Sequence, residues 1–309
     1  MNNPTFFDVK NSLRLFGLKQ EFDFLTKLYN KKKLPKVLLL TSNKGSGKAT
    51  LVNHFLISIF DKQNYDFNRN HISKNSDINN QLGNNIFSNI IYLCGSDFKS
   101  VKIEDLRNLK KKIFQSTILN KDRFIVFDDV ELFNNNSLNA LLKIVEEPNK
   151  NNYFILINNR SKPLLETIKS RSLEIKVILN EKKRLNIIEH LVKFFELNIS
   201  FNPNLIKLTP GNFIKFDYLC RENDISINDK FIDNLSLLLN LYKKNKDIMF
   251  VNIAFFIADY YIKSLIDKKI SNNDEIFEIK DFIYNNLDRY LSYNINLNSF
   301  INTVSSKLK

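Results

Sequence analysis

The sequence has only two cysteines, Cys94 and Cys220, and they stand far apart along the chain. A structural zinc site needs four ligands, which usually come in closely spaced pairs. The three histidines, His54, His71 and His190, are isolated from one another and from both cysteines. We therefore expect no zinc and no other metal centre, and we expect each histidine to be at the surface or hydrogen-bonded inside.

Targeting segments and long apolar runs are also missing. The N-terminus lacks the charged and then apolar pattern of a secretory signal. The most apolar late stretch, Ile248–Ile262, is interrupted by Asn252 and Asp259 and is too short to span a bilayer. We interpret it as a buried helix, and we expect a cytoplasmic protein in a reducing compartment, without a membrane partner.

The 46 Lys and Arg residues outnumber the 33 Asp and Glu residues, which gives a formal net charge of +13. This excess favours a polyanionic partner, nucleic acid first. Lys, Asn and Ile are all frequent, so codon bias explains the Lys content equally well. Charge alone therefore decides little.

The order of patterns along the chain predicts an α/β domain followed by helical domains. Short apolar runs alternate with helical patterns in the first half, which is typical of βαβ units around a parallel sheet. The polar segment Asn64–Asn89 is predicted to be a long loop or an irregular insertion. The five predicted strands are Lys36–Thr41, Ile90–Cys94, Arg123–Asp128, Tyr153–Asn158 and Leu173–Val177.

After about residue 179 the strand pattern stops. Glu181–Glu196 is predicted to be an amphipathic helix, Leu208–Gly211 a turn into another, and everything after about Ser226 helical. The predicted domains are an α/β domain over residues 1–178, a small helical domain over 179–225 and a C-terminal helical domain over 226–309.

A phosphate-binding loop follows the first predicted strand and precedes a predicted helix. Its glycines let backbone N–H groups face a phosphate, the helix N-terminus adds positive potential, and a lysine reaches the outer phosphates. The nucleotide-binding candidates are Lys44, Gly45, Ser46, Gly47, Lys48, Ala49 and Thr50.

Two positions of this loop depart from the usual pattern. Ser42 replaces the first glycine, and Ala49 replaces the Ser or Thr whose hydroxyl ligates Mg²⁺. Thr50 is no substitute, because it points about 100° around the helix. Backbone amides and Lys48 still suit ATP or ADP, so nucleotide binding stays an expectation, whereas metal-assisted hydrolysis is not expected.

The third predicted strand ends in Asp128 and Asp129, where P-loop proteins place carboxylates beside the phosphates. The first holds Mg²⁺, and the second is normally a glutamate that orients the attacking water. Asp129 is one methylene shorter than glutamate. A solvated acidic turn is the alternative interpretation, but together with Ala49 this substitution predicts a weak ATPase or none.

Two further motifs resemble the clamp-loader family of AAA+ proteins. Asn139–Pro148 reads NALLKIVEEP, and Thr167–Ser172 reads TIKSRS, in the family's order and spacing. The resemblance covers residues 13–178 and extends weakly beyond them. Other segments that fall where the family has counterparts are Leu15–Gly17, Ile103–Leu109, Gly211–Lys215 and Leu291–Leu308.

The resemblance implies a AAA+ P-loop domain with a five-stranded parallel sheet, a helical lid and a C-terminal collar for oligomerisation. It implies a ring with gamma/tau and delta subunits that opens the sliding clamp and places it on primer–template DNA. Motor subunits of the ring hydrolyse ATP at sites completed by an arginine from the next subunit, and Arg171 takes that position. Ser172 replaces the motif's cysteine. Sensor 1 falls at Asn158 or Asn159, and sensor 2 at Lys215.

Three functions compete for this chain. Ala49 and Asp129 disfavour an active motor subunit. Both residues agree with a stator, which keeps Arg171 but does not hydrolyse ATP, and so does the absence of a long segment after the collar. An unrelated P-loop enzyme, such as a small-molecule kinase, would not explain the NALLK and SRS motifs.

Contact with DNA is a separate expectation, because basic residues cluster on one predicted helix and suit the phosphates threaded through the ring. A merely solvated lysine-rich helix explains the cluster equally well. The candidates are Arg107, Lys110 and Lys111.

Overall fold

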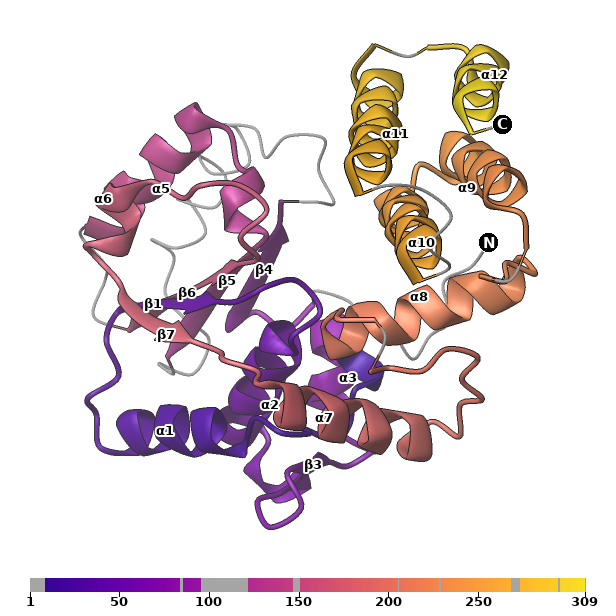
Figure 1. The fold of residues 1–309 in the computed structure, drawn as a ribbon. Helices are drawn as coiled ribbons and strands as arrows, with labels where there is room; N and C mark the ends of the chain where they lie inside the picture. Colours follow the sequence, from indigo (N-terminus) through magenta and orange to yellow (C-terminus); the bar gives the residue numbers. More distant parts are fainter. Residues whose placement is uncertain are drawn as a thin grey trace. The chain divides into compact units, whose positions relative to one another are not determined.

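The five apolar runs of the N-terminal half form one parallel sheet, in the order β4-β5-β6-β1-β7 (Figure 1). All five predicted strands are confirmed, each end to within about one residue. The inner strands β5, β6 and β1 are continuous apolar runs, as a parallel sheet covered on both faces requires. The strands are β1 Val37–Thr41, β4 Ile90–Cys94, β5 Arg123–Asp128, β6 Asn152–Asn158 and β7 Leu173–Lys176.

A computed structural model describes residues 9–83, 86–95, 122–146, 151–204, 206–227, 229–267, 273–293 and 295–308. The chain divides into two compact units, Asn2–Ile214 and Lys215–Lys309. The division falls inside one helix, so the finer partition into three domains stays a prediction. The DNA-contact candidates Arg107, Lys110 and Lys111 lie outside the described residues.

Helices cover both faces of the sheet (Figure 1). Alternate residues of β5 point to opposite faces, so Phe124 and Val126 pack in the core beside α1 (Lys19–Asn30) and α2 (Lys48–Phe60). Ile125 and Phe127 pack in the core on the other face, which contains α5 and α6. These two helices are Asn135–Glu146 and Glu166–Lys169.

The polar segment Asn64–Asn89 contains short regular elements, so of its two predicted forms the long loop is wrong and an insertion between α2 and β4 is what the structure has. A two-stranded ribbon and α3 (Asp77–Gly83) lie within it. Buried polar groups pair with one another here: Asn53 Nδ2 donates to Asn79 Oδ1 at 3.0 Å, and Ser76 Oγ donates to Asp61 Oδ2 at 2.6 Å. The ribbon strands are β2 Tyr65–Asp66 and β3 His71–Ile72.

Two of the histidines show the expected partners. His54 is fully buried, and its ring nitrogens lie 3.1 Å from the Tyr65 hydroxyl and 2.9 Å from the Ser12 carbonyl. Burial lowers the pKa of His54 to about 4, so the ring is neutral at physiological pH. His190 is exposed and contacts the Asn186 carbonyl.

The segment after the sheet begins with α7 (Glu181–Phe194) and leads into α8 (Pro210–Glu222). Arg184 of α7 is buried, and its guanidinium donates to the carbonyls of Pro203, Ile206 and Leu208. These hydrogen bonds fix the loop that carries the chain to α8, and they explain why a charged side chain is buried there.

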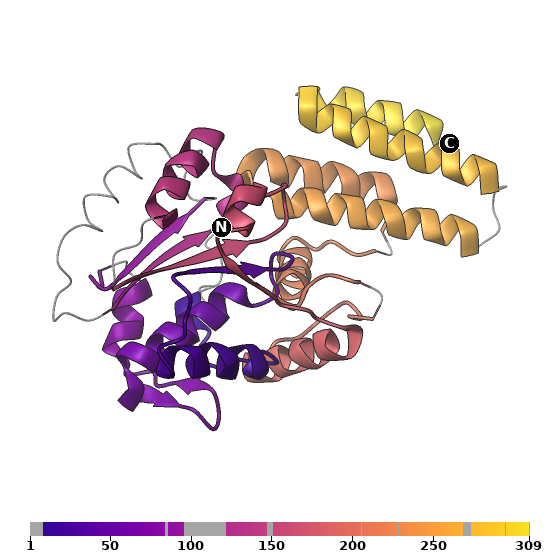
Figure 2. The same cartoon turned by 90° about the vertical axis from the view of Figure 1, so that its left-hand side faces the viewer.

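The C-terminal unit is a bundle of four helices, among the described residues, in which α10 packs on α9 and α11 (Figure 2). The buried-helix prediction for Ile248–Ile262 is confirmed, and Asn252 and Asp259 lie on its exposed side. The helix runs on to Asp267, so it is long and apolar enough to cross a membrane, with 50% of its apolar window buried. The four helices are α9 Phe231–Asn245, α10 Ile248–Asp267, α11 Asn273–Tyr293 and α12 Leu297–Lys307.

Candidate nucleotide site and exposed arginine

The predicted phosphate loop joins the carboxyl end of β1 to the N-terminus of α2. Gly45 and Gly47 have φ of 80° and 90°, a left-handed conformation that glycine adopts without strain. The N–H of Ser42 donates to the carbonyl of Asn158 at 3.2 Å, which ties the loop to the end of β6. The backbone therefore has the curled form that the sequence predicts.

Lys48, the lysine of the loop, is turned inward. Its side chain is buried, and its ammonium donates to the carbonyl oxygens of Ser42 and Asn43 at 2.8 and 3.0 Å and to Ser46 Oγ at 3.3 Å. Burial lowers the pKa of Lys48 to about 8, although nearby carboxylates, Asp128 foremost, act in the opposite direction. In this arrangement the ammonium binds the loop's own oxygens.

The second carboxylate at the end of β5 is contacted by Lys44, by Asn159 and by the Cys94 thiol, which lies 3.6 Å from Oδ2. Asp129 is buried, with Oδ2 2.9 Å from the Lys44 ammonium and Oδ1 accepting a hydrogen bond from Asn159 Nδ2 at 2.6 Å. Burial alone would lower the pKa of Lys44, but the hydrogen bond and charge of Asp129 outweigh it and raise that pKa. Both oxygens of Asp129 are therefore committed to donors of the protein itself.

The first carboxylate, Asp128, is also engaged. Its Oδ2 accepts the Tyr92 hydroxyl at 2.5 Å, and its Oδ1 accepts the N–H of Asp129 at 2.8 Å. Burial raises the pKa of the Asp128 carboxyl. Within the described part of the chain no group of three or more His, Cys, Asp or Glu could hold a metal ion.

Ala49 and Thr50 begin the first turn of α2, where the usual P-loop would offer a hydroxyl to the metal. Ala49 is half-buried and packs against the hydrophobic core below the sheet. It supplies no oxygen. The first turn of α2 therefore lacks the hydroxyl ligand that a P-loop usually offers to Mg²⁺.

Of the two sensor-1 candidates, Asn159 is the one that contacts the carboxylates. Besides its bond to Asp129, its Nδ2 lies 3.4 Å from Asp128 Oδ1. The side chain of Asn158 instead accepts the N–H of Arg160 at 2.9 Å. Lys215, the sensor-2 candidate, belongs to the C-terminal unit, where its ammonium binds Asp247 Oδ2 at 2.6 Å.

The N-terminus of α8 lies directly on the phosphate loop. Thr209 Oγ1 donates to the Lys44 carbonyl at 2.6 Å, and the N–H of Gly211 donates to the Gly45 carbonyl at 2.9 Å. A Cβ on Gly45 would come within 2.5 Å of Thr209 Oγ1. Glycine is thus required at this position for packing as well as for its backbone conformation.

Arg171 follows α6 and stands apart from the phosphate loop. Its guanidinium donates to the Thr167 carbonyl at 3.1 Å and lies 3.1 Å from Glu146 Oε1, and its side chain is 42% exposed. Ser172, where the motif has cysteine, donates its hydroxyl to the Ile168 carbonyl at 2.9 Å and closes the end of α6. The guanidinium is oriented but remains at the surface.

Sequence reasoning missed three contacts of the site. They are the Tyr92 hydroxyl on Asp128, the Lys44 ammonium on Asp129 and the Thr209 hydroxyl on the loop. Each joins segments far apart in sequence. Cys94 of β4 pairs with Asp128 of β5. Tyr92 lies two residues before Cys94 on the same face of β4, which brings its hydroxyl to the Asp128 carboxylate.

Comparison with known proteins matches residues 17–180 to the family model described as DNA polymerase III, delta subunit. The DNA polymerase III subunit delta' of Buchnera aphidicola subsp. Baizongia pistaciae is 24% identical over 221 residues, 70% of this chain and 64% of that protein. The subunit delta' of Buchnera aphidicola subsp. Schizaphis graminum is 30% identical over 200 residues, 60% of each. The chain therefore spans less than two thirds of the length of these relatives.

Among solved structures, a crystal structure of a DNA polymerase III gamma subunit-related protein from Thermotoga maritima covers 93% of this chain and 99% of that one. Its TM-score is 0.50 at 15% sequence identity. This likeness concerns the fold, and with the strand order it confirms the predicted α/β architecture of the AAA+ type with helical domains after it.

Proposed function

The chain belongs to the DNA polymerase III delta-prime family, and from this premise we propose that it is the stator of a bacterial clamp loader. In this role it assembles with gamma/tau and delta subunits in the cytoplasm and helps to place the sliding clamp on primer–template DNA. It hydrolyses no ATP itself and offers Arg171 to the ATP site of a neighbouring subunit.

The observation that carries the proposal is the ion pair between Lys44 and Asp129. A carboxylate that orients water or binds Mg²⁺ works best without a competing cation, and Asp129 already has the Lys44 ammonium on one oxygen and the Asn159 amide on the other. Ala49 removes the hydroxyl that would hold the metal from the other side. Lost hydrolysis is therefore supported by the contacts of the site as well as by two substitutions.

Nucleotide binding is a separate question from ATP hydrolysis. The curled backbone at Gly45 and Gly47 suits a phosphate, but the ammonium of Lys48 would have to leave three oxygens of its own loop to reach one. We propose that ATP or ADP binds weakly and without Mg²⁺ at this site.

Arg171 supports the trans-acting half of the proposal. An arginine that serves a neighbour must be exposed, held in a defined direction and separate from its own chain's phosphate loop. The Arg171 side chain is 42% exposed, and both contacts of its guanidinium lie outside that loop. A guanidinium delivered to the γ-phosphate of ATP stabilises the charge of the transition state.

The experiment that tests this proposal begins with the purified chain alone. We expect ATP turnover no higher than that of a Lys48→Ala variant, because neither enzyme would have a working metal site. ATP turnover by the wild-type chain that Lys48→Ala abolishes would make it a motor subunit and contradict the proposal. Assembly with gamma/tau and delta subunits, measured by gel filtration, should proceed equally well with both forms.

A further inference from the structure

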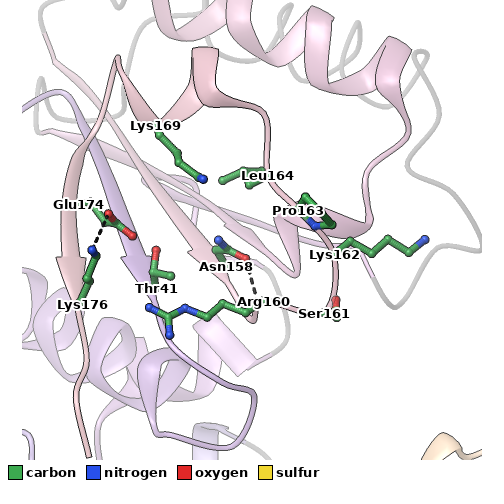
Figure 3. A pocket seen from close by; sticks show the side chains of 10 residues that line it. All are labelled: Thr41, Asn158, Arg160, Ser161, Lys162, Pro163, Leu164, Lys169, Glu174 and Lys176. Atoms are coloured by element: carbon green, nitrogen blue, oxygen red, sulfur yellow. Dashed lines mark hydrogen bonds and ion pairs between the residues drawn. The ribbon is translucent and has the colours of Figure 1, made fainter.

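A pocket of about 470 Å³ opens at the carboxyl ends of β1, β6 and β7 (Figure 3). Its polar lining comes from the three strand ends, from the turn after β6 and from α6. The residues that matter here are Thr41, Asn158, Arg160, Lys162, Lys169 and Lys176.

Strand register explains why the pocket lies away from α2. Thr41 pairs with Asn158 of β6 and with Lys176 of β7, so these three side chains stand in a row on one face of the sheet. The same face of β1 carries Val37 and Leu39, which pack in the core that contains Leu164 and Ile168 next to α6. Thr41 precedes the phosphate loop, but its side chain faces away from the helix that the loop opens.

The lining is strongly cationic. Four of its side chains are Lys or Arg, and Glu174 is its one acid. Lys169 binds Glu166 at 2.7 Å, and Lys176 lies 3.8 Å from Glu174. Arg160 and Lys162 form no ion pair with any described residue, so positive charge in the pocket exceeds what its own carboxylate can balance.

The hydroxyl of Thr41 provides a separate indication of a ligand. Thr41 is 4% exposed, and its Oγ1 has no hydrogen-bond partner among the described residues. Figure 3 shows this oxygen directed into the pocket, between Asn158 and Glu174. A buried hydroxyl without a partner is unfavourable, and an anion in the pocket would supply the missing acceptor.

The turn after β6 brings a guanidinium to the same place. Arg160 has φ of 58°, a left-handed conformation that is uncommon for a residue other than glycine. The side chain of Asn158 stabilises it by accepting the Arg160 N–H at 2.9 Å. In Figure 3 the Arg160 side chain runs back across the pocket, and its guanidinium ends beside Thr41.

We propose that this pocket binds a phosphate-class anion, with Thr41 Oγ1 donating a hydrogen bond and Arg160, Lys162, Lys169 and Lys176 supplying the charge. None of these side chains belongs to the phosphate loop, although the site adjoins it and burial, helped by the charge of Arg160, lowers the pKa of Lys48. The site does not depend on the stator role, because a motor subunit could carry the same pocket.

Pyrophosphate binding to the full chain, measured by calorimetry at constant ionic strength, tests the proposal. We expect binding to the wild type at millimolar concentration, and at least about fivefold weaker binding by Thr41→Val and by Arg160→Gln. Lys182→Gln, which removes an exposed positive charge on α7, is the matched control and should bind like the wild type.

Thr41→Val also controls for folding, since removing an unpartnered hydroxyl should leave the melting temperature unchanged or raise it. The proposal would be overturned if both pocket variants bound pyrophosphate with wild-type affinity. It would also be overturned if Lys48→Ala lost pyrophosphate binding while Arg160→Gln kept it. ADP in place of pyrophosphate identifies the source of the phosphate. Weaker ADP binding by Arg160→Gln indicates a nucleotide, and unchanged ADP binding indicates a free phosphate.

Discussion

The ammonium of Lys44 lies 2.9 Å from Oδ2 of Asp129. The lysine comes from the phosphate loop, and the aspartate comes from the end of β5, where a P-loop ATPase keeps a carboxylate for water or metal. A cation of the protein itself therefore stands where a metal-dependent ATPase needs an open coordination site. Since Asp129 is buried and Lys44 is largely exposed, the pair neutralises a carboxylate that would otherwise be costly to bury.

The first prediction concerns the stability that this pair contributes. Lys44→Met should lower the free energy of unfolding by about 1–2 kcal/mol, because Asp129 stays buried and loses its ion pair. Urea denaturation measures the change. Lys182→Met, which removes an exposed lysine without a buried partner, should fall within about 0.5 kcal/mol of the wild type, and an equal effect of both variants would argue against the role given to the pair.

The second prediction concerns the metal. Ala49→Ser restores a hydroxyl at the start of α2, but Lys44 still occupies Asp129, so ADP affinity should not respond to Mg²⁺ in this single variant. The double variant Lys44→Met/Ala49→Ser should show tighter ADP binding with Mg²⁺ than with EDTA. Fluorescent ADP titrations measure both. A Mg²⁺ response in Ala49→Ser alone would mean that Lys44 does not block the metal.

The third prediction concerns pH. Burial lowers the pKa of Lys48 to about 8, whereas the unfolded chain keeps its lysine protonated up to about 10.4. The unfolded state then binds more protons between these values, so stability rises with pH in this window. The wild type should therefore gain stability relative to Lys48→Met as the pH increases from about 8 to about 10. Melting temperatures of the two proteins across this range measure it, and a difference that is constant or shrinks would be inconsistent with a buried ammonium.

The fourth prediction concerns the position of Arg171. Glu146→Gln keeps an oxygen near the guanidinium but removes the charge of an exposed ion pair, which is worth about 0.2–1 kcal/mol. In the assembled loader the kcat for ATP should fall by about 1.5- to 5-fold with KM unchanged, because the arginine acts on the transition state. Glu189→Gln, which breaks an exposed ion pair with Lys193 on α7, is the control. A rise in KM without a fall in kcat would assign Glu146 another role.

The central strands were predictable because β1, β5 and β6 are apolar runs buried at nearly all of their positions. The edge strand β7 carries Glu174 and Lys176 and has no buried position. The ribbon at Tyr65 and Ile72 was not predictable, since its strands are two residues each and its neighbours are polar. The ribbon is joined to the domain by distant partners such as His54, whose ring contacts the Tyr65 hydroxyl, and local patterns do not show them. Asn252 and Asp259 look like interruptions of the apolar stretch until the bundle places them outside, and the helix runs beyond Ile262 to Asp267.

In the candidate site, too, features set by neighbouring residues were predictable from the sequence and contacts between distant residues were not. The curled loop and the positions of Asp128 and Asp129 follow from strand, turn and helix signals near each residue. The pairing of Lys44 with Asp129 joins residues 85 positions apart and depends on β1 and β5, which flank β6 in the sheet. Substitutions at Ala49 and Asp129 indicated a weakened ATPase, whereas the contact that explains it required the fold.

ATP turnover by the reconstituted loader, with clamp and primed DNA present, tests the central claim most directly. Arg171→Ala in this chain should lower hydrolysis at the adjoining site by on the order of 10³-fold, while the loader still assembles. Arg69→Ala, which removes an arginine whose side chain is 80% exposed in the ribbon, should leave turnover unchanged. Equal turnover with the two variants would contradict the account.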